Sequence, residues 1–129
     1  MLARSFLSAT DLGISEVERE ALITTLFAFE RGEIINFTMR HFRETCGTPA
    51  CICGWANYFS GGQAFAEVST MSGVLATKRL HGRLPKQLQY LFDIQGFPEQ
   101  TAATPAQAAA ALANYLTRGE PHWEEVAGS

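Results

Sequence analysis

The most pronounced hydrophobic pattern in the chain lies in residues 15–31 and predicts a long helix. Ser15 and Glu18 form an S-x-x-E capping box, in which each side chain satisfies a backbone amide at the start of the helix. Gly32 stands where a left-handed residue commonly ends a helix. Apolar residues cover most of the helical circumference: Val17, Ala21, Leu22, Ile23, Leu26, Phe27, Ala28 and Phe29. We therefore expect this helix at the centre of the core.

A second well-defined helix is predicted over residues 104–118. Thr104 is its expected N-cap and Pro105 its first helical residue, where a missing amide N–H costs nothing. Gln107 completes a T-x-x-Q box, and the alanine-rich run that follows has high intrinsic helix propensity. After this helix, we expect Trp123 to fold back onto the domain.

Three shorter helices are predicted between these two, over residues 48–60, 63–77 and 84–95. For the first, Thr48 is the expected N-cap and Pro49 the first helical residue. The second is predicted from a three- and four-residue spacing of apolar side chains, at Phe65, Val68, Met71 and Leu75. The third begins near Pro85 and directs its apolar side chains inward, at Leu88, Leu91 and Phe92.

Together these elements predict an all-α protein, a compact and irregular bundle of about five helices that forms a single domain of 129 residues. Residues 1–14 are expected to form an N-terminal arm. Residues 34–47 are too apolar for a solvated loop, and a strand, a helical turn and an irregular segment all stay open for them. The chain shows neither the alternation of strand hairpins nor a repeat at solenoid spacing.

The composition narrows the class of protein. A hydrophobic fraction of 47% and a charged fraction of 18% argue against wholesale disorder. The net charge of -3 argues against a protein that binds nucleic acid through bulk charge. No apolar run follows a basic start, so no secretory signal is expected, and the most apolar stretch, residues 21–29, is far shorter than the roughly 20 residues of a membrane span. We expect a cytoplasmic protein that does not enter a membrane.

Candidate chemistry concentrates around three cysteines within eight positions, Cys46, Cys51 and Cys53, a pattern unlike a secreted disulfide framework. In the predicted helix Cys51 stands at the third position, where amide donors and the helix dipole lower a thiol pKa. Cys51 is therefore a candidate reactive thiol, with Cys46 as its resolving partner or fellow ligand. Cys53 points about 200° away from Cys51 on the helix, so these two cannot easily share a metal.

Two other interpretations of this segment stay open. His41 with Cys46 and Cys51 offers three metal ligands, although H-x4-C-x4-C matches no standard zinc-finger spacing. We favour a structural interpretation, in which the cysteines are small apolar side chains that fill a tight junction. Gly54 would then allow a close backbone approach, and Trp55 would anchor the core.

The sequence of this segment resembles a motif found in other proteins. The run N-F-x-M-x-x-F, from Asn36 to Phe42, precedes C-G-T-P-A-C-I-C-G-W-A, from Cys46 to Ala56. These runs resemble a family of small bacterial and bacteriophage proteins that share a C-G-T-x-x-C-x-A-G-W-A segment and have no established activity. The motif positions are Gly47, Thr48, Gly54 and Trp55. Cys53 replaces the family's usual alanine, which argues against a shared role for it. The resemblance implies a bacterial or prophage setting and an intracellular location.

The sequence gives little sign of catalysis. His122, Glu124 and Glu125 follow the last predicted helix but lack the helical H-E-x-x-H pattern of metalloproteases. There is no phosphate loop, dinucleotide fingerprint or nucleophile elbow, and no cofactor is expected. We expect a non-enzymatic accessory or protein-interaction domain, with a thiol-dependent redox enzyme or sensor using Cys51 and Cys46 as the alternative. We expect a protein partner and no nucleic acid, and a homo-oligomer stays open.

Overall fold

Helices provide all the regular secondary structure in the part of the chain that the structure describes. The computed structural model describes residues 5–34, 37, 51–70, 79–80, 82–92 and 104–127. Its helices are α1 (Ala9–Leu12), α2 (Glu16–Glu30), α3 (Ile52–Phe59), α4 (Glu67–Thr70), α6 (Lys86–Leu91), α8 (Pro105–Arg118) and α9 (Trp123–Ala127). The predicted compact all-α fold is therefore confirmed. Among these described helices, none has the length and apolar character needed to cross a membrane.

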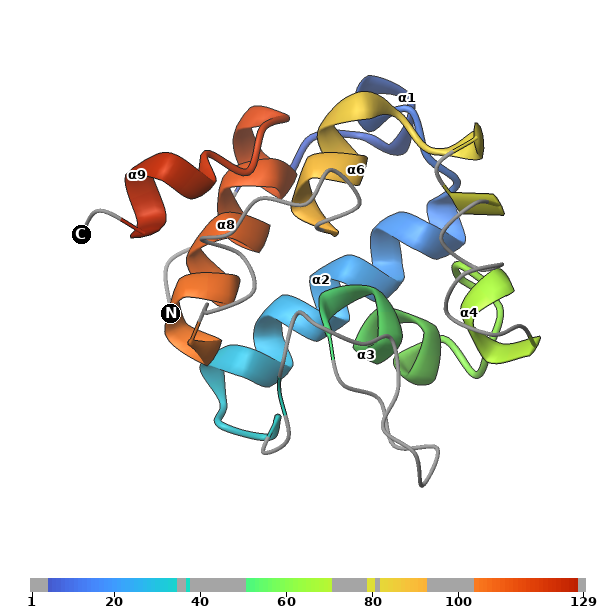
Figure 1. Cartoon of the computed structure of the whole chain (residues 1–129), viewed down its shortest axis with the longest axis horizontal. Coiled ribbons are helices and arrows are strands. Elements are labelled where there is room, and N and C mark those ends of the chain that lie inside the picture. Colours follow the sequence, from blue (N-terminus) through green and yellow to red (C-terminus); the bar gives the residue numbers. More distant parts are fainter. Residues whose placement is uncertain are drawn as a thin grey trace.

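Helix α2 crosses the middle of the fold, with α8 packed on one side and α3 on the other (Figure 1). Its Leu22 and Leu26 are 0% and 1% exposed. Leu112 and Leu116 of α8 are equally buried and belong to the same hydrophobic cluster. The central position predicted for residues 15–31 is thus confirmed, because a helix that is apolar around most of its surface needs partners on several sides.

Two capping boxes fix the starts of the longest described helices. At α2, the Ser15 amide donates to Glu18 Oε1 at 3.0 Å, and the Glu18 amide donates to Ser15 Oγ at 3.1 Å. At α8, the same reciprocal pair joins Thr104 and Gln107 at 2.9 and 3.1 Å. Both boxes were predicted from sequence, and each satisfies two amides that the helix itself leaves without partners.

The N-terminal arm contains one helical turn, α1, that the sequence pattern did not predict. The segment before it is tied to α8 by a hydrogen bond from the Leu7 amide to the Leu116 carbonyl at 2.8 Å. Arg19 Nε also donates to the Leu7 carbonyl at 2.7 Å. The Tyr115 hydroxyl donates to the Leu12 carbonyl at 3.3 Å, so both ends of α1 are held against the bundle.

Three helices begin later than predicted. Helix α3 has Cys51 as its N-cap rather than Thr48 and starts at Ile52, and residues 48–50 lie outside the described residues. Helix α4 starts at Glu67 rather than at residue 63, because Phe65 has a φ of +52° that no α-helix tolerates. Helix α6 starts at Lys86 with Pro85 as its N-cap. The predicted continuations over 71–77 and 93–95 also lie outside the described residues.

Phe65 holds this left-handed conformation because its side chain is completely buried. Its ring meets the ring of Phe92 edge to face, with centroids 5.0 Å apart. Asn57 Nδ2 donates to the carbonyls of Ala64 and Phe65 at 2.8 and 3.3 Å, which fixes the turn to α3. The burial of one aromatic side chain therefore overrides the helical spacing in the sequence.

Candidate functional site

Cys51 is the N-cap of α3, whereas the sequence pattern placed it at the third helical position. Its φ and ψ of -100° and 178° are extended, and its Sγ accepts a hydrogen bond from the Gly54 amide at 3.4 Å. The thiol thus satisfies one of the unpaired amides of the first turn, as serine or aspartate usually does. Cys51 is 2% exposed, so this contact is shielded from solvent.

Cys53, two residues further on, is completely buried in the main hydrophobic cluster. Burial raises the pKa of its thiol well above the ordinary value, because a thiolate would lose its hydration. Electrostatic interaction with Cys51 and with Glu67 raises that pKa further. Cys53 therefore behaves as a small apolar side chain at neutral pH.

The other residues predicted for the cysteine segment fall into two groups. Trp55 is 8% exposed and packs with Ala28 and Ile34 in a second, smaller cluster. Gly54 is buried beside it on α3. The remaining residues lie outside the described residues, so the thiol couple and the metal alternative stay predictions: His41, Cys46, Gly47 and Thr48. In residues 5–34, 37, 51–70, 79–80, 82–92 and 104–127, no three His, Cys, Asp or Glu side chains are placed to hold a metal ion.

Arg83 joins two acidic side chains from distant parts of the chain. Its Nε and Nη2 donate to the two carboxylate oxygens of Glu67 at 2.7 and 3.1 Å. Its Nη1 donates to Glu18 Oε2 at 2.9 Å. The side chains of Glu18 and Glu67 are only 10% and 17% exposed, whereas that of Arg83 is 43% exposed. This ion network ties the start of α2 to the start of α4.

The charges of this network shift the pKa values of two side chains, Glu67 and Tyr115. The hydrogen bond from Arg83 lowers the pKa of Glu67 against the opposing effect of burial. Burial raises the pKa of the Tyr115 hydroxyl, and the charge of Glu18 adds to this rise. Both carboxylate oxygens of Glu18 are held by hydrogen bonds: Oε1 accepts the Ser15 amide, and Oε2 accepts Arg83 Nη1.

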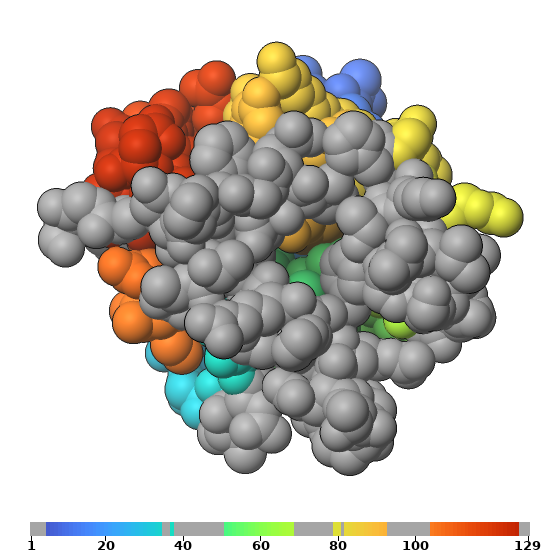
Figure 2. Space-filling model, viewed as in Figure 1, coloured from blue at the N-terminus to red at the C-terminus, as the bar shows by residue number. Residues whose placement is uncertain are grey.

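A cavity of about 510 Å³ lies between α6 and the segment that leads into α9. We call it the α6–α9 pocket; its lining residues are Gln87, Tyr90, Glu120, Pro121, His122, Trp123 and Glu124. In Figure 2 the C-terminal segment (red) and α6 (yellow) meet at the surface. Trp123 lines the pocket with a side chain that is only 5% exposed, and its Nε1 donates to the Tyr90 carbonyl at 2.9 Å. This contact confirms that Trp123 folds back onto the domain.

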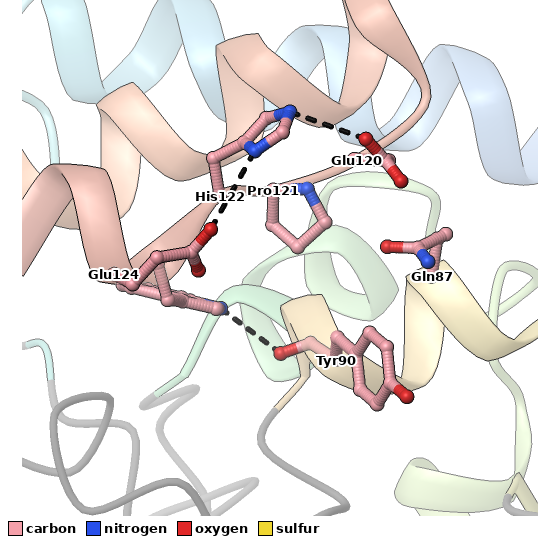
Figure 3. Close-up of a pocket in the computed structure, with 7 residues that line it drawn as sticks. Gln87, Tyr90, Glu120, Pro121, His122 and Glu124 are labelled. Carbon is pink, nitrogen blue, oxygen red and sulfur yellow. Dashed lines mark hydrogen bonds and ion pairs between the residues drawn. The ribbon is translucent and has the colours of Figure 1, made fainter.

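His122 stands at the centre of the acidic side of this pocket (Figure 3). Its Nε2 lies 3.3 Å from Glu120 Oε2, and its Nδ1 lies 3.7 Å from Glu124 Oε1 and 3.3 Å from Glu125 Oε2. The residue has a φ of +53°, a strained conformation for a side chain with a Cβ. Its carbonyl accepts the amides of Glu125 and Val126 at 3.0 and 3.1 Å, so the strain is held in place by the start of α9.

The sequence carries a local sign of this pocket. Three acidic residues and one histidine fall within six positions, at Glu120, His122, Glu124 and Glu125. Without the metalloprotease pattern, the sequence alone assigns no chemistry to this grouping. Nothing in the sequence marks Gln87 and Tyr90 as pocket residues, because they lie on a helix about 30 residues earlier in the chain.

Comparisons with known proteins add no further assignment. No protein-family model matches the chain, and neither a curated protein nor a solved structure matches it. The geometry of the described residues is therefore the basis for the functional proposals.

Proposed function

We propose that the protein is a non-enzymatic accessory domain of bacterial or prophage origin that binds a basic side chain of a partner protein in the α6–α9 pocket. The observation that carries this proposal is the pairing of carboxylates with aromatic rings around one open cavity. The bacterial or prophage origin and a cytoplasmic location draw support from the resemblance in the cysteine segment.

The pocket has the size and polarity of a side-chain binding site. Its volume of about 510 Å³ falls within the roughly 300–1,000 Å³ typical of ligand pockets. Glu120 and Glu124 stand on its acidic side, with side chains 54% and 79% exposed. Both carboxylates are therefore accessible to a cation from a partner while they stay in contact with His122.

The aromatic residues favour a basic partner over other ligands. An ammonium or guanidinium group is attracted to an aromatic face, and Lys86 Nζ already lies 5.7 Å from the centroid of the Tyr90 ring. Lysine and arginine also bring an apolar stem, which can lie along the rings of Tyr90 and Trp123. An acidic partner would instead meet Glu120 and Glu124 with like charge.

The thiol-dependent alternative has one supporting observation, the hydrogen bond from the Gly54 amide to Cys51 Sγ. Such a contact stabilises a thiolate as well as a helix end. Cys51→Ser separates the two roles, because a serine hydroxyl keeps the cap and removes the thiol. Retained partner binding in this variant favours the interaction domain, whereas its loss in a stably folded variant favours the thiol function.

The pocket is tested by NMR titration of ¹⁵N-labelled protein with three small probes: acetyl-lysine amide, acetyl-arginine amide and the uncharged acetyl-norleucine amide. We expect the two basic probes to bind in the millimolar range and to shift amides in residues 87–90 and 120–124. The norleucine probe should not bind. Raising the salt concentration from 0.1 to 1 M should weaken binding, because the screening length falls from about 10 Å to about 3 Å.

A double variant supplies the control for charge. Glu120→Gln with Glu124→Gln removes two exposed carboxylates, each worth about 0.5 kcal/mol, so affinity should fall about fivefold. The matched pair Glu16→Gln with Glu20→Gln removes the same charge from α2 and should leave affinity unchanged. Equal binding of the norleucine probe, or shifts confined to other residues, would refute the proposal.

A further inference from the structure

A second hollow, separate from the α6–α9 pocket, lies between α2 and the end of α3. We call this cavity of about 290 Å³ the α2–α3 groove; it is lined by Glu16, Val17, Glu20, Ala21, Thr24, Phe59 and Ser60. The α2 residues repeat at helical spacing, so they form one continuous face of the helix. No residue of this groove lines the α6–α9 pocket.

Exposed apolar side chains of the described residues lie in the groove and directly beside it. Among the described residues, the large apolar side chains that are exposed are Val17 at 43% and Tyr58 at 59%. Val17 lies in the groove, and the ring of Tyr58 packs edge to face against groove residue Phe59, with centroids 5.5 Å apart. Exposed apolar side chains that gather at one hollow mark an interaction surface.

The charged side chains that line the groove, Glu16 and Glu20, are both acidic. Glu16 and Glu20 are exposed one helical turn apart on the α2 side. Glu20 meets Arg19 at 3.5 Å with 68% of its side chain exposed, and the described residues offer Glu16 no ion pair. A complementary partner therefore carries apolar side chains flanked by lysine or arginine.

We propose that the α2–α3 groove docks a short basic amphipathic helix of another protein. The stripe from Val17 to Thr24 covers eight residues, and its seven steps of 1.5 Å give a length of about 10 Å, which matches two turns of a partner helix. Apolar side chains three or four positions apart on that helix enter the groove, and basic side chains beside them face Glu16 and Glu20. This surface acts independently of the function proposed for the α6–α9 pocket.

A second copy of this chain fits the groove poorly. Copies related by a twofold axis place the same patch on itself. The acidic side chains of α2 would then face their own equivalents, and like charges that meet across an interface disfavour it. The charge pattern thus selects a basic partner over self-association.

The experiment selects peptides from a phage-displayed library on a 16-residue helical template with randomised surface positions. We expect the enriched peptides to carry apolar residues three or four positions apart and at least a threefold excess of lysine and arginine over the input. In NMR titrations they should shift the amides of residues 16–24 and 59–60. Glu20→Lys should lower affinity at least tenfold, and Thr24→Lys, which adds positive charge at an exposed position, should do the same.

The control is Glu124→Lys, which reverses an exposed charge in the other pocket and should change affinity by less than twofold. Loss of binding in Glu124→Lys but not in Glu20→Lys would assign the peptides to the α6–α9 pocket and overturn the docking proposal. Failure to enrich any peptide family, or enrichment without basic residues, would also overturn it. A dimer in sedimentation that Glu20→Lys dissociates would overturn the proposal as well, because the occupant of the groove would then be a second copy of the chain.

Discussion

Replacing Arg83 with methionine isolates the contribution of the partly buried ion network to stability. Arg83 makes three hydrogen bonds to Glu18 and Glu67, whose side chains are 10% and 17% exposed. Methionine keeps much of the apolar stem but leaves both carboxylates without their cation. The variant therefore measures the cost of two shielded acidic groups that have lost a charged partner.

The expected cost follows from how exposed the three side chains are. Breaking a fully buried ion pair costs about 3–5 kcal/mol, whereas an exposed pair contributes about 0–1 kcal/mol. Because the Arg83 side chain is 43% exposed, solvent screens part of the interaction. We expect a loss of about 2 kcal/mol in the free energy of unfolding, which corresponds to a fall of roughly 8 °C in Tm.

The chain contains a matched control for this measurement. Arg31 binds Glu33 with the same two-point geometry, at 2.7 and 3.2 Å, but both side chains are more than half exposed. Arg31→Met should therefore leave the unfolding midpoint unchanged. Urea unfolding followed by circular dichroism and by tryptophan fluorescence gives both midpoints, and agreement of the two probes checks two-state behaviour.

The comparison refutes the reasoning if Arg83→Met and Arg31→Met unfold at the same urea concentration. Equal midpoints would mean that solvent screens the Arg83 network as fully as the surface pair, despite the burial of Glu18 and Glu67. A loss in Arg83→Met that Glu67→Gln relieves would instead support the argument, since it would show that the unpaired carboxylate causes the loss.

Three other predictions test the pKa shifts and the cap of α3. Because the pKa of Glu67 is lowered in the folded state, its contribution to folding stability is complete above the unfolded pKa of about 4.3 and is lost as pH falls through the folded pKa. Arg83→Met should therefore reduce the fall of Tm at acid pH. The pKa of Cys53 is raised in the folded state, so this residue affects stability at alkaline pH instead. Its contribution to folding stability is lost as pH rises above the unfolded pKa of about 8.5. Cys53 should resist a thiol reagent in native buffer and react in urea, and rapid native labelling at this residue would contradict its burial. Cys51→Ala should cost about 1 kcal/mol through the lost cap, and Cys51→Ser should recover most of it.

Helix starts were predictable from sequence where the capping atoms lie within three residues of each other. Ser15 with Glu18, and Thr104 with Gln107, form their boxes through local contacts alone. Cys51 shows the limit of this reasoning, because the usual N-cap residues carry a hydroxyl, carboxylate or amide oxygen. The Thr48-Pro49 pair led to a predicted N-cap three residues before the observed one. In the structure the Sγ atom of Cys51 caps the helix.

The features that sequence reasoning missed depend on contacts between distant residues. Glu18 and Arg83 are 65 positions apart, and nothing local marks Arg83 as different from its basic neighbours. Phe65 departs from the helical pattern because it packs on Phe92, which is 27 positions away. Tertiary packing decides both outcomes, and a one-dimensional pattern does not contain it.

The start of α2 connects the ion network to the proposed α2–α3 groove. Glu16, Glu18 and Glu20 alternate along the helix, and steps of two residues rotate each side chain by about 200°. Glu18 is consequently buried against Arg83, while Glu16 and Glu20 face away from the core and line the groove. The capping box and the ion pair of Glu18 hold this turn of the helix in place, so the backbone that carries Glu16 and Glu20 is ordered before any partner arrives. A partner helix then loses little free energy to ordering the groove, which favours binding by a short segment.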